Sequence, residues 1–245
     1  MKTVLITGAT SGFGRATAEL LLSKNYRLIL LGRREEKLKE LEGENVFTYV
    51  LDVRDRNAID KFSKTLPKEF KEIDILINNA GLALGLSDAV VSDLDDWEKM
   101  VDTNIKGVLH FTKFVLPAMK ERNSGMIINI GSVAGHAPYK GGNVYGATKA
   151  FVKQFSRNLR ADLYGTDIKI TNIEPGMAET EFSDVRFKGD HEKAKEVYAG
   201  MRPLTADDIA ETILWIIERP LHVNIDNIEI MPLDQTWGGL TVNRK

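Results

Sequence analysis

Short apolar runs alternate with longer amphipathic stretches along most of this chain, and this alternation restricts the possible folds more than any other feature. Six runs have the length and the Gly, Asn and Asp boundaries of buried strands; they are Val4–Ile6, Leu28–Leu31, Val46–Leu51, Ile73–Ile77, Met126–Ile130 and Ile168–Ile173. Apolar residues recur at helical spacing in Arg15–Lys24, Glu35–Leu41, Arg56–Leu66, Asp95–Lys120, Val144–Tyr164 and Ala206–Glu218. The pattern predicts an α/β fold, a doubly wound parallel sheet of Rossmann type flanked by helices and joined by right-handed crossovers.

The whole chain, residues 1–245, is expected to fold as a single domain. No repeat, low-complexity tract or linker rich in Pro, Ser or Gly divides it, and its length suits one large α/β domain. Residues 182–201 depart from the alternation, because they are polar and charged and lie between a strand end and Ala206–Glu218. This segment is either an ordinary pair of surface helices or a small helical lid over an active site, and we favour the lid.

The composition excludes several classes of protein. The chain has 33 basic and 35 acidic residues and a net charge of −2, so no overall field attracts it to nucleic acid or to a membrane. Without cysteine it has no disulfides and no thiolate chemistry. No apolar stretch approaches the ~20 residues of a membrane span, and the first apolar run is too short for a signal peptide. We therefore expect a cytoplasmic protein.

A glycine-rich turn follows the first predicted strand directly. Its sequence is Thr7-Gly8-Ala9-Thr10-Ser11-Gly12-Phe13-Gly14, and a helix comes next. Glycine permits a tight turn and lets a phosphate approach the backbone, while the helix N-terminus offers free N–H groups and the positive end of its dipole. The spacing is G-x-x-x-G-x-G rather than G-x-G-x-x-G. Its place in the first strand–helix unit predicts that these residues bind the pyrophosphate of a dinucleotide.

The end of the second predicted strand indicates which dinucleotide binds. A site for NAD usually has an acidic residue there for the ribose hydroxyls, whereas a site for NADP has arginine for the 2′-phosphate. Here the strand ends in Leu31-Gly32-Arg33-Arg34. A positive side chain at a helix N-terminus is repelled by the positive end of the helix dipole, and this energetic cost suggests that the two arginines are kept to bind a ligand. Arg33 and Arg34 therefore favour NADP, and a solvated basic helix start is the alternative.

Two further strand ends are candidates for contact with the cofactor. Asp52 and Val53 follow the third strand and either flank the adenine or, in the case of Asp52, cap the next helix. Asn78-Asn79-Ala80-Gly81 closes the fourth strand. Small residues at that position let a cofactor lie close to the backbone at the carboxyl edge of the sheet, so we expect Asn79, Ala80 and Gly81 to bind it.

A tyrosine and a lysine four residues apart are the candidates for proton transfer. Tyr145 and Lys149 share one helix face about one turn apart. A free tyrosine has a pKa of about 10, too high for efficient proton exchange near neutrality, and a nearby ammonium lowers it. Ser132 follows the fifth strand, and its hydroxyl is placed to hold a carbonyl oxygen beside Tyr145. Each residue alone is ordinary; together, downstream of a nucleotide turn, they predict an oxidoreductase.

With these motifs in order, the chain resembles the short-chain dehydrogenase/reductase family over nearly its whole length. The resemblance rests on Thr7-Gly8-x-x-x-Gly12-x-Gly14, Asn78-Asn79-Ala80-Gly81, Asn104, Ser132, Tyr145-x-x-x-Lys149 and Pro175-Gly176-x-x-x-Thr180. It implies a sheet of about seven strands and a catalytic tetrad of Asn104, Ser132, Tyr145 and Lys149. It also implies that Asn104 kinks the Asp95–Lys120 helix and holds a water that relays protons to Lys149, that Lys149 binds the nicotinamide ribose, and that the nicotinamide amide is held by Pro175, Gly176, Met177, Ala178 and Thr180.

Longer stretches are similar to one subgroup of that family, the NADP-dependent 3-hydroxy acid dehydrogenases. They include Gly141–Phe151, Ile173–Gly176 and Thr180–Asp190. The subgroup contains serine and L-allo-threonine dehydrogenases and malonic semialdehyde reductases. The resemblance implies direct hydride transfer between NADP and a small 3-hydroxy acid or its 3-oxo acid or semialdehyde, with Tyr145 as the acid/base. It also implies a homotetramer whose interfaces use Asp95–Lys120, Val144–Tyr164 and the C-terminal strand.

The carboxylate of such a substrate needs a cationic partner. Arg186 in the proposed lid is the first candidate and Lys140 the second; a solvated loop cation is the alternative for each. His136 either lines the pocket or lies in a turn. The four histidines lack the spacing of metal ligands, so we expect no catalytic metal. The alternatives for the whole chain are a 3-oxoacyl carrier-protein reductase, a general ketone reductase, or a regulator that binds NADP without turnover.

Overall fold

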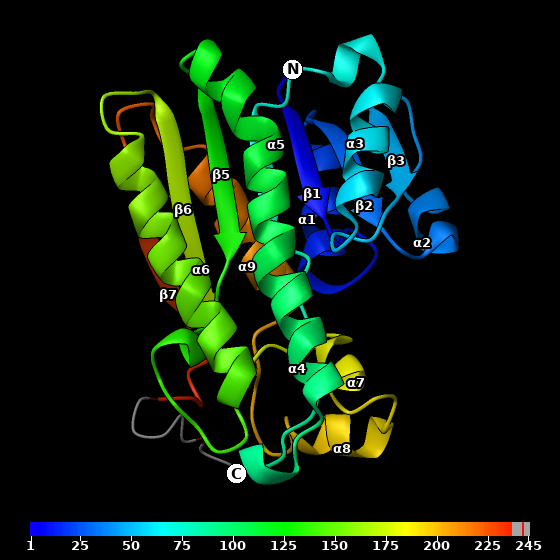
Figure 1. Cartoon of the computed structure of the whole chain (residues 1–245), viewed down its shortest axis with the longest axis vertical. Coiled ribbons are helices and arrows are strands. Elements are labelled where there is room, and N and C mark those ends of the chain that lie inside the picture. Colours follow the sequence, from blue (N-terminus) through cyan, green and yellow to red (C-terminus); the bar gives the residue numbers. More distant parts are fainter. Residues whose placement is uncertain (237–241, 243–245) are drawn as a thin grey trace.

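One parallel sheet organises the chain in the computed structural model, which describes residues 1–236 and 242. Its strands lie in the order β3-β2-β1-β4-β5-β6-β7 (Figure 1), and every neighbouring pair is parallel. The strands are β1 (Thr3–Thr7), β2 (Arg27–Gly32), β3 (Val46–Val50), β4 (Ile75–Asn78), β5 (Gly125–Ile130), β6 (Ile168–Pro175) and β7 (Asn227–Ile230). The predicted fold class is confirmed, and β7 is the strand that only the family resemblance implied.

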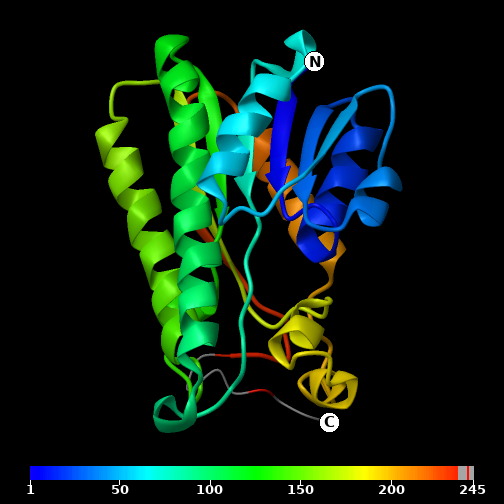
Figure 2. The same ribbon diagram turned by 45° about the vertical axis from the view of Figure 1, so that its right-hand side comes forward.

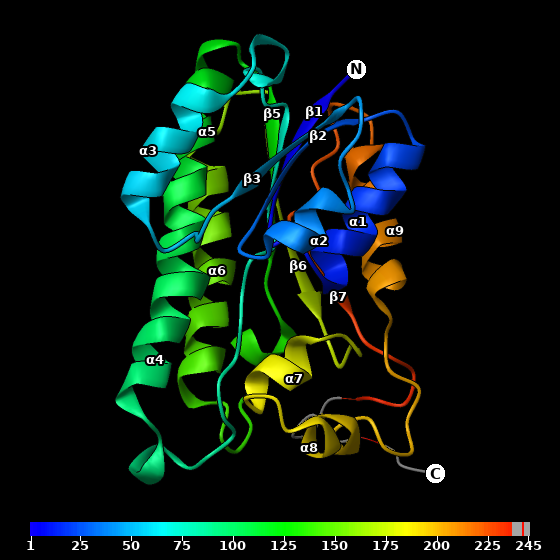
Figure 3. The same ribbon diagram turned by 90° about the vertical axis from the view of Figure 1, so that its right-hand side faces the viewer.

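Helices cover both faces of the sheet, as Figure 3 shows. On one face lie α1 (Gly12–Ser23), α2 (Glu35–Lys39) and α9 (Ala206–Ile217); on the other lie α3 (Arg56–Thr65), α5 (Gly107–Glu121) and α6 (Asn143–Asp162). Successive strand side chains alternate between the two layers. In β1, Val4 and Ile6 join the first core while Leu5 joins the second. Two apolar cores therefore hold the sheet, and its carboxyl edge is left for a site.

The predicted Asp95–Lys120 helix is a continuous helical stretch with one irregular turn. It consists of α4 (Leu94–Val101), a π-helical turn η3 (Asp102–Lys106) and α5. Asn104 lies in the π-helical turn and is 1% exposed. Such turns often occur at functional sites, because the extra residue redirects a side chain. The irregularity that the resemblance implied at Asn104 is thus present as a π-helical turn.

The segment predicted as a lid lies beyond the carboxyl ends of the strands. It contains two short helices, α7 (Phe182–Arg186) and α8 (His191–Glu196), drawn in yellow in Figure 2. The Ser183 hydroxyl contacts the Tyr198 hydroxyl at 2.6 Å, and Tyr198 donates to the Ala178 carbonyl at 2.8 Å. The segment is therefore tied to the end of β6, where a lid is expected, and its motion stays a prediction.

Helix α1 begins three residues before the predicted start. Glycine is a poor helix former, so the pattern placed the first helical residue at Arg15, whereas the helix begins at Gly12. The glycine turn and the helix N-terminus therefore overlap. Within the part of the chain that the structure describes, no helix is long and apolar enough to cross a bilayer.

Candidate active site

A cavity of about 1000 Å³ opens at the carboxyl edge of the sheet. The predicted cofactor residues that line it are Gly8, Thr10, Ser11, Gly12, Phe13, Arg33, Arg34, Asp52, Val53, Asn79, Ala80, Gly81, Tyr145, Lys149, Pro175, Gly176, Met177, Ala178 and Thr180. Ser132 and Arg186 line it as well. Of the predicted site residues, Ala9, Gly14 and Asn104 are not part of its lining. One cavity thus brings together groups that lie on segments far apart in the sequence.

The glycine turn forms one wall by close approach of backbone segments. Gly8 and Gly12 have positive φ angles of 68° and 50°, which side-chain-bearing residues rarely adopt. A Cβ atom on Gly14 would lie 2.4 Å from the Gly8 carbonyl oxygen. Ala9 is fully buried in the first core. Gly14 and Ala9 therefore shape the turn by packing, while Gly8, Gly12 and the α1 N-terminus face the cavity.

Both predicted phosphate-binding arginines lie at this wall. Arg33 is exposed. Arg34 donates from Nη2 to the Thr10 carbonyl at 3.1 Å, and from Nη1 to Glu181 at 2.7 Å. Glu181 precedes α7, so the Arg34–Glu181 ion pair connects the wall formed by the glycine turn to the proposed lid. Two guanidinium groups at one rim suit a doubly charged phosphate.

Asp52 does not cap a helix, so that alternative is wrong. The N-cap of α3 is Asp55, whose side chain accepts from the Ala58 N–H. Asp52 instead forms an ion pair with Arg54 at 2.6 Å, and the hydrogen bond from Arg54 holds the pKa of Asp52 below its usual range. Asp52 therefore lines the cavity as a carboxylate. The sequence left the two functions of Asp52 open, because Asp52 and Asp55 are both suited to a cap position and only the structure shows that Asp55 occupies it.

Two residues of the predicted tetrad, Lys149 and Asn104, lie beside Gly81. Lys149 donates to the Ile130 carbonyl at 2.7 Å, and a Cβ on Gly81 would lie 3.5 Å from Lys149 Nζ and 3.4 Å from Asn104 Oδ1. Asn104 exchanges hydrogen bonds with the backbone of Leu82, accepting at 2.9 Å and donating at 2.8 Å. Asn104 thus fixes the loop that follows β4, and it lies behind Lys149 rather than at the cavity surface.

Ser132 and Tyr145 line the same cavity, with Tyr145 one helix turn before Lys149 on α6. Ser132 caps the short helix η4 (Val133–Gly135) by accepting from Ala134 N–H at 3.1 Å, and it donates to the Pro175 carbonyl at 3.4 Å. The Ser132 side chain also acts to lower the pKa of Tyr145. The end of β5, the end of β6 and α6 therefore meet at these two hydroxyl groups.

Burial dominates the titration of Tyr145 and Lys149. It raises the pKa of Tyr145 above its usual range, and the Ser132 side chain and the charge of Arg186 oppose this rise. Burial lowers the pKa of Lys149 to about 8. We expected the Lys149 ammonium to lower the pKa of Tyr145, but Lys149 Nζ lies 5.8 Å from the ring centroid and the opposing groups are Ser132 and Arg186. The protonated phenol is thus favoured in this environment.

Arg186 reaches the tetrad from α7. Its guanidinium lies 5.7 Å from the Tyr145 ring centroid, and it donates to the Gly85 carbonyl at 3.1 Å and to the Tyr139 hydroxyl at 2.8 Å. Tyr139 also lines the cavity, and no motif in the sequence identified it. Phe182, which was read only as the start of the lid, packs on the Tyr145 ring at 5.7 Å. The Arg186 guanidinium and the Phe182 ring therefore lie beside the phenol.

Two other candidates lie outside the cavity. Lys140 has a side chain that is 86% exposed and pairs with Asp88 at 3.5 Å, so the solvated-loop alternative holds for it. His136 caps the C-terminus of η4 and contacts Glu174 and Glu229, so its turn alternative is confirmed. A missed residue is Gln235, which lines the cavity and accepts from the Met177 N–H at 2.7 Å. Nothing in its sequence context marked it.

Comparison with known proteins fixes the relationship of this chain. The family model described as short chain dehydrogenase matches residues 2–190. The chain belongs to the short-chain dehydrogenase family. It is 54% identical to the NADP-dependent 3-hydroxy acid dehydrogenase YdfG of Salmonella typhi, over 98% of this chain and 99% of that one. It is 50% identical to the serine 3-dehydrogenase of Rhizobium radiobacter, over 99% and 98%.

A solved structure of the same family has nearly the same backbone. The closed form of serine dehydrogenase complexed with NADP+ is 52% identical and superposes with a TM-score of 0.96, over 99% of this chain and 100% of that one. The family resemblance expected from the motifs is thus confirmed at the level of sequence and of fold. The cavity of this short-chain dehydrogenase lies at the carboxyl edge of a sheet, where Rossmann-type folds bind dinucleotides.

Proposed function

We propose that this chain is an NADP-dependent dehydrogenase that interconverts a small 3-hydroxy acid and its 3-oxo acid or semialdehyde. The observation that supports the substrate class is Arg186, whose guanidinium lies 5.7 Å from the Tyr145 ring. In a 3-hydroxy acid the carboxylate is two carbons from the hydroxyl-bearing carbon. A guanidinium at this distance is therefore placed to bind the carboxylate while the hydroxyl contacts Tyr145. Serine, L-allo-threonine and 3-hydroxypropionate fit this description.

The nucleotide wall fits NADP. Glycines keep the wall clear of side chains at Gly8 and Gly12, the α1 N-terminus faces the cavity, and Arg33 and Arg34 supply donors for a 2′-phosphate. The remaining contacts are assigned to Asp52 and Val53 at the adenine, to Asn79, Ala80 and Gly81 beside the nicotinamide ribose, and to the segment from Pro175 to Thr180 at the nicotinamide. When bound, NADP+ supplies the hydride acceptor at nicotinamide C4 and a positive charge that favours the Tyr145 phenolate.

The protein residues then perform the proton transfer. Tyr145 accepts the hydroxyl proton during oxidation and donates it during reduction, while the Ser132 hydroxyl holds the same substrate oxygen. Lys149 donates to the Ile130 carbonyl, which holds its side chain in place, and its ammonium would bind the nicotinamide ribose. Asn104 holds the Leu82 backbone and so maintains the loop between Lys149 and the cofactor. This arrangement separates the positioning of the substrate oxygen from the transfer of its proton.

The assembly we propose is a homotetramer in the cytoplasm, with the single catalytic domain repeated four times. The family resemblance implies interfaces on the α4–α5 stretch, α6 and β7. Exposed apolar side chains beside α4 support a partner surface there: Val90 is 95% exposed and Leu94 62%. Light scattering measures the mass in solution, and a monomer contradicts this assembly.

The experiment that tests the function follows the reduction of NADP+ through the near-ultraviolet absorbance of the NADPH that forms. L-Serine, L-allo-threonine and 3-hydroxypropionate are the substrates, and NAD+ and simple secondary alcohols are the controls. We expect turnover with the hydroxy acids and NADP+. Turnover with plain alcohols or ketones but with none of the acids would instead point to a general reductase and remove the role given to Arg186.

A further inference from the structure

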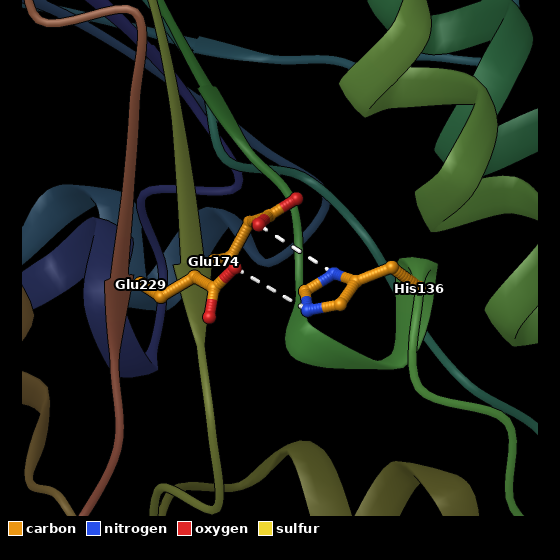
Figure 4. A group of neighbouring side chains, drawn as sticks. All are labelled: His136, Glu174 and Glu229. Carbon is orange, nitrogen blue, oxygen red and sulfur yellow. Dashed lines mark ion pairs between the residues drawn. The ribbon is translucent and has the colours of Figure 1, made fainter. Parts of the chain in front are cut away.

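A buried carboxylate lies just behind the active site, outside the cavity. The Glu174 side chain is 0% exposed. Lys153 donates to its Oε2 at 2.9 Å, and His136 Nδ1 lies 3.6 Å from the same oxygen. Glu229 lies 3.3 Å from His136 Nε2, as Figure 4 shows. We call Lys153, Glu174, His136 and Glu229 the Glu174 cluster.

Two asparagines complete the hydrogen bonds of Glu174. Asn172 donates to Oε1 at 3.0 Å and Asn227 donates to Oε2 at 3.0 Å. A carboxylate without solvent is stable only when it is paired and hydrogen-bonded, and both oxygens of Glu174 meet this condition. Removal of one partner therefore leaves a buried charge uncompensated, which is strongly destabilising.

The cluster joins the elements that carry the active site. Lys153 follows Lys149 by one turn and Tyr145 by two turns on the same face of α6. Glu174 directly precedes Pro175 at the end of β6. His136 follows η4, whose N-cap is Ser132. The Lys153–Glu174 pair thus connects the helix of the acid/base to the strand end whose carbonyl accepts from Ser132.

The donor atoms of this cluster also resemble a metal site, but its charge argues against one. One ligand atom each of His136, Glu174 and Glu229 lie within 4.8 Å of one another. The Lys153 ammonium is 2.9 Å from Glu174 and 3.3 Å from His136 Nδ1, and 4.0 Å from Glu229. A divalent cation bound there would have to displace a positive group that already neutralises the carboxylates. The ammonium is therefore the cation of this cluster.

We propose that Lys153 and Glu174 are positioning residues for the dehydrogenase reaction. Their ion pair sets how α6 lies against the end of β6, and hence where the Tyr145 hydroxyl lies relative to the Ser132 hydroxyl and the nicotinamide segment. The proposal rests on the proposed function, because it assigns a role in that reaction. A displacement of ~1 Å at reacting groups lowers a rate by up to ~10²-fold. The cluster therefore acts on the chemical step without touching the substrate.

The test compares Lys153→Met with Lys153→Arg. Lys153→Met leaves the Glu174 carboxylate buried without its ammonium, whereas Lys153→Arg keeps the charge. We expect Lys153→Met to lower kcat by ~10–100-fold, to raise the primary deuterium isotope effect on kcat as hydride transfer becomes limiting, and to leave the Kd of NADPH within ~2-fold. Lys153→Arg should recover most of kcat. The exposed Lys39→Met, whose partner is Glu35, is the matched control and should change none of these.

A purely structural role gives a different result. In that case Lys153→Met and Glu174→Gln lower Tm but leave kcat and its isotope effect unchanged at a temperature where the variants are folded, and the proposal is overturned. If Lys153→Met does not fold, the double variant Lys153→Met/Glu174→Gln removes both charges together, and kcat and its isotope effect are measured on that variant instead. Any alcohol that the unmodified chain oxidises serves as substrate. Failure with every 3-hydroxy acid refutes only the proposed substrate, and failure with every alcohol refutes both proposals.

Discussion

The two walls of the cavity are built from different parts of the protein. We call Thr7–Gly14 and Asn79–Gly81, with Arg33 and Arg34 at the rim, the nucleotide wall, and Tyr139, Phe182 and Arg186 the substrate wall. In the nucleotide wall, backbone segments approach so closely that a Cβ on Gly8 would lie 2.9 Å from the Ala80 Cα. In the substrate wall, side chains from separate loops contact one another, as Arg186 contacts Tyr139.

This difference determines which substitutions each wall tolerates. A backbone wall tolerates almost no change, because Gly8 and Gly12 hold conformations that other residues rarely adopt. A side-chain wall can change its chemistry by one substitution while the sheet stays the same. We therefore expect the nucleotide wall to determine how the cofactor binds, and the substrate wall to determine which alcohol is oxidised. The following variants test this division.

Tyr145→Phe should have the largest effect, because Tyr145 lies where the two walls meet. The variant keeps the ring that packs on Phe182 and removes the acid/base. We expect kcat to fall by ~10²–10⁴-fold, with the Kd of NADPH measured by fluorescence almost unchanged. Full activity in this variant would remove the assignment of the proton donor. A large loss of NADPH affinity would show that the two walls do not function separately.

The pH dependence of stability tests the cost of burying Lys149 at the same junction. Its pKa is about 8 in the folded chain and 10.5 ordinarily. Below pH 8 both folded and unfolded chains carry the ammonium, and the full burial cost is present. Between pH 8 and 10.5 the unfolded chain binds more protons, so the free energy of unfolding rises with pH, by about 3 kcal/mol over the window. Above 10.5 neither state is charged.

A comparison with Lys149→Met isolates the contribution of Lys149 to the free energy of unfolding. Other lysines and tyrosines titrate between pH 8 and 10.5 in both the unmodified chain and the variant, so their contributions cancel. Urea denaturation in the absence of cofactor should show that the unmodified chain gains stability relative to Lys149→Met as the pH rises from 8 to 10.5. A constant difference across that window would contradict the lowered pKa of Lys149.

The nucleotide wall and the sheet could be predicted from sequence because both depend on local pattern. Glycine at fixed positions and short apolar runs are visible in a single chain, and six of the seven strands were found in this way. The strand β7 was not, because Asn227–Ile230 is short, half-buried and polar at alternate positions. Its place in the sheet depends on pairing with β6, which is a long-range contact.

The substrate wall could be predicted only in part. Arg186 was identified through the charge of the expected substrate, but Tyr139 carries no charge or spacing that marks it. Arg186 forms hydrogen bonds with Gly85, which is 101 residues away in the sequence, and with Tyr139, which is 47 residues away. Contacts between segments so distant in the chain follow from tertiary packing, which periodicity does not reveal.

The double variant Arg33→Ala/Arg34→Ala should weaken the binding of NADPH much more than the binding of NADH. Each arginine lost from a phosphate removes a charge-assisted hydrogen bond, of ~1.5–3 kcal/mol. Because two such hydrogen bonds are lost, we expect the Kd of NADPH to rise by ~10²–10⁴-fold and that of NADH by much less, measured by fluorescence titration. Equal losses for the two cofactors would mean that these arginines support the wall in general, for example through the Arg34 contact with Thr10, and do not select the 2′-phosphate.

Arg186→Ala and Tyr139→Phe should have the smallest effects, and both should be confined to the substrate. Loss of the guanidinium removes the carboxylate partner, so KM for L-serine or 3-hydroxypropionate should rise by about 10-fold, with the Kd of NADPH unchanged. Tyr139→Phe removes only the hydroxyl that accepts from Arg186 at 2.8 Å, while the Gly85 carbonyl still accepts from Nε. Its KM should rise only a few-fold. A simple secondary alcohol has no carboxylate and is the control. If both variants lose activity equally with the acid and with the alcohol, Arg186 acts on Tyr145 through its charge and does not bind the carboxylate.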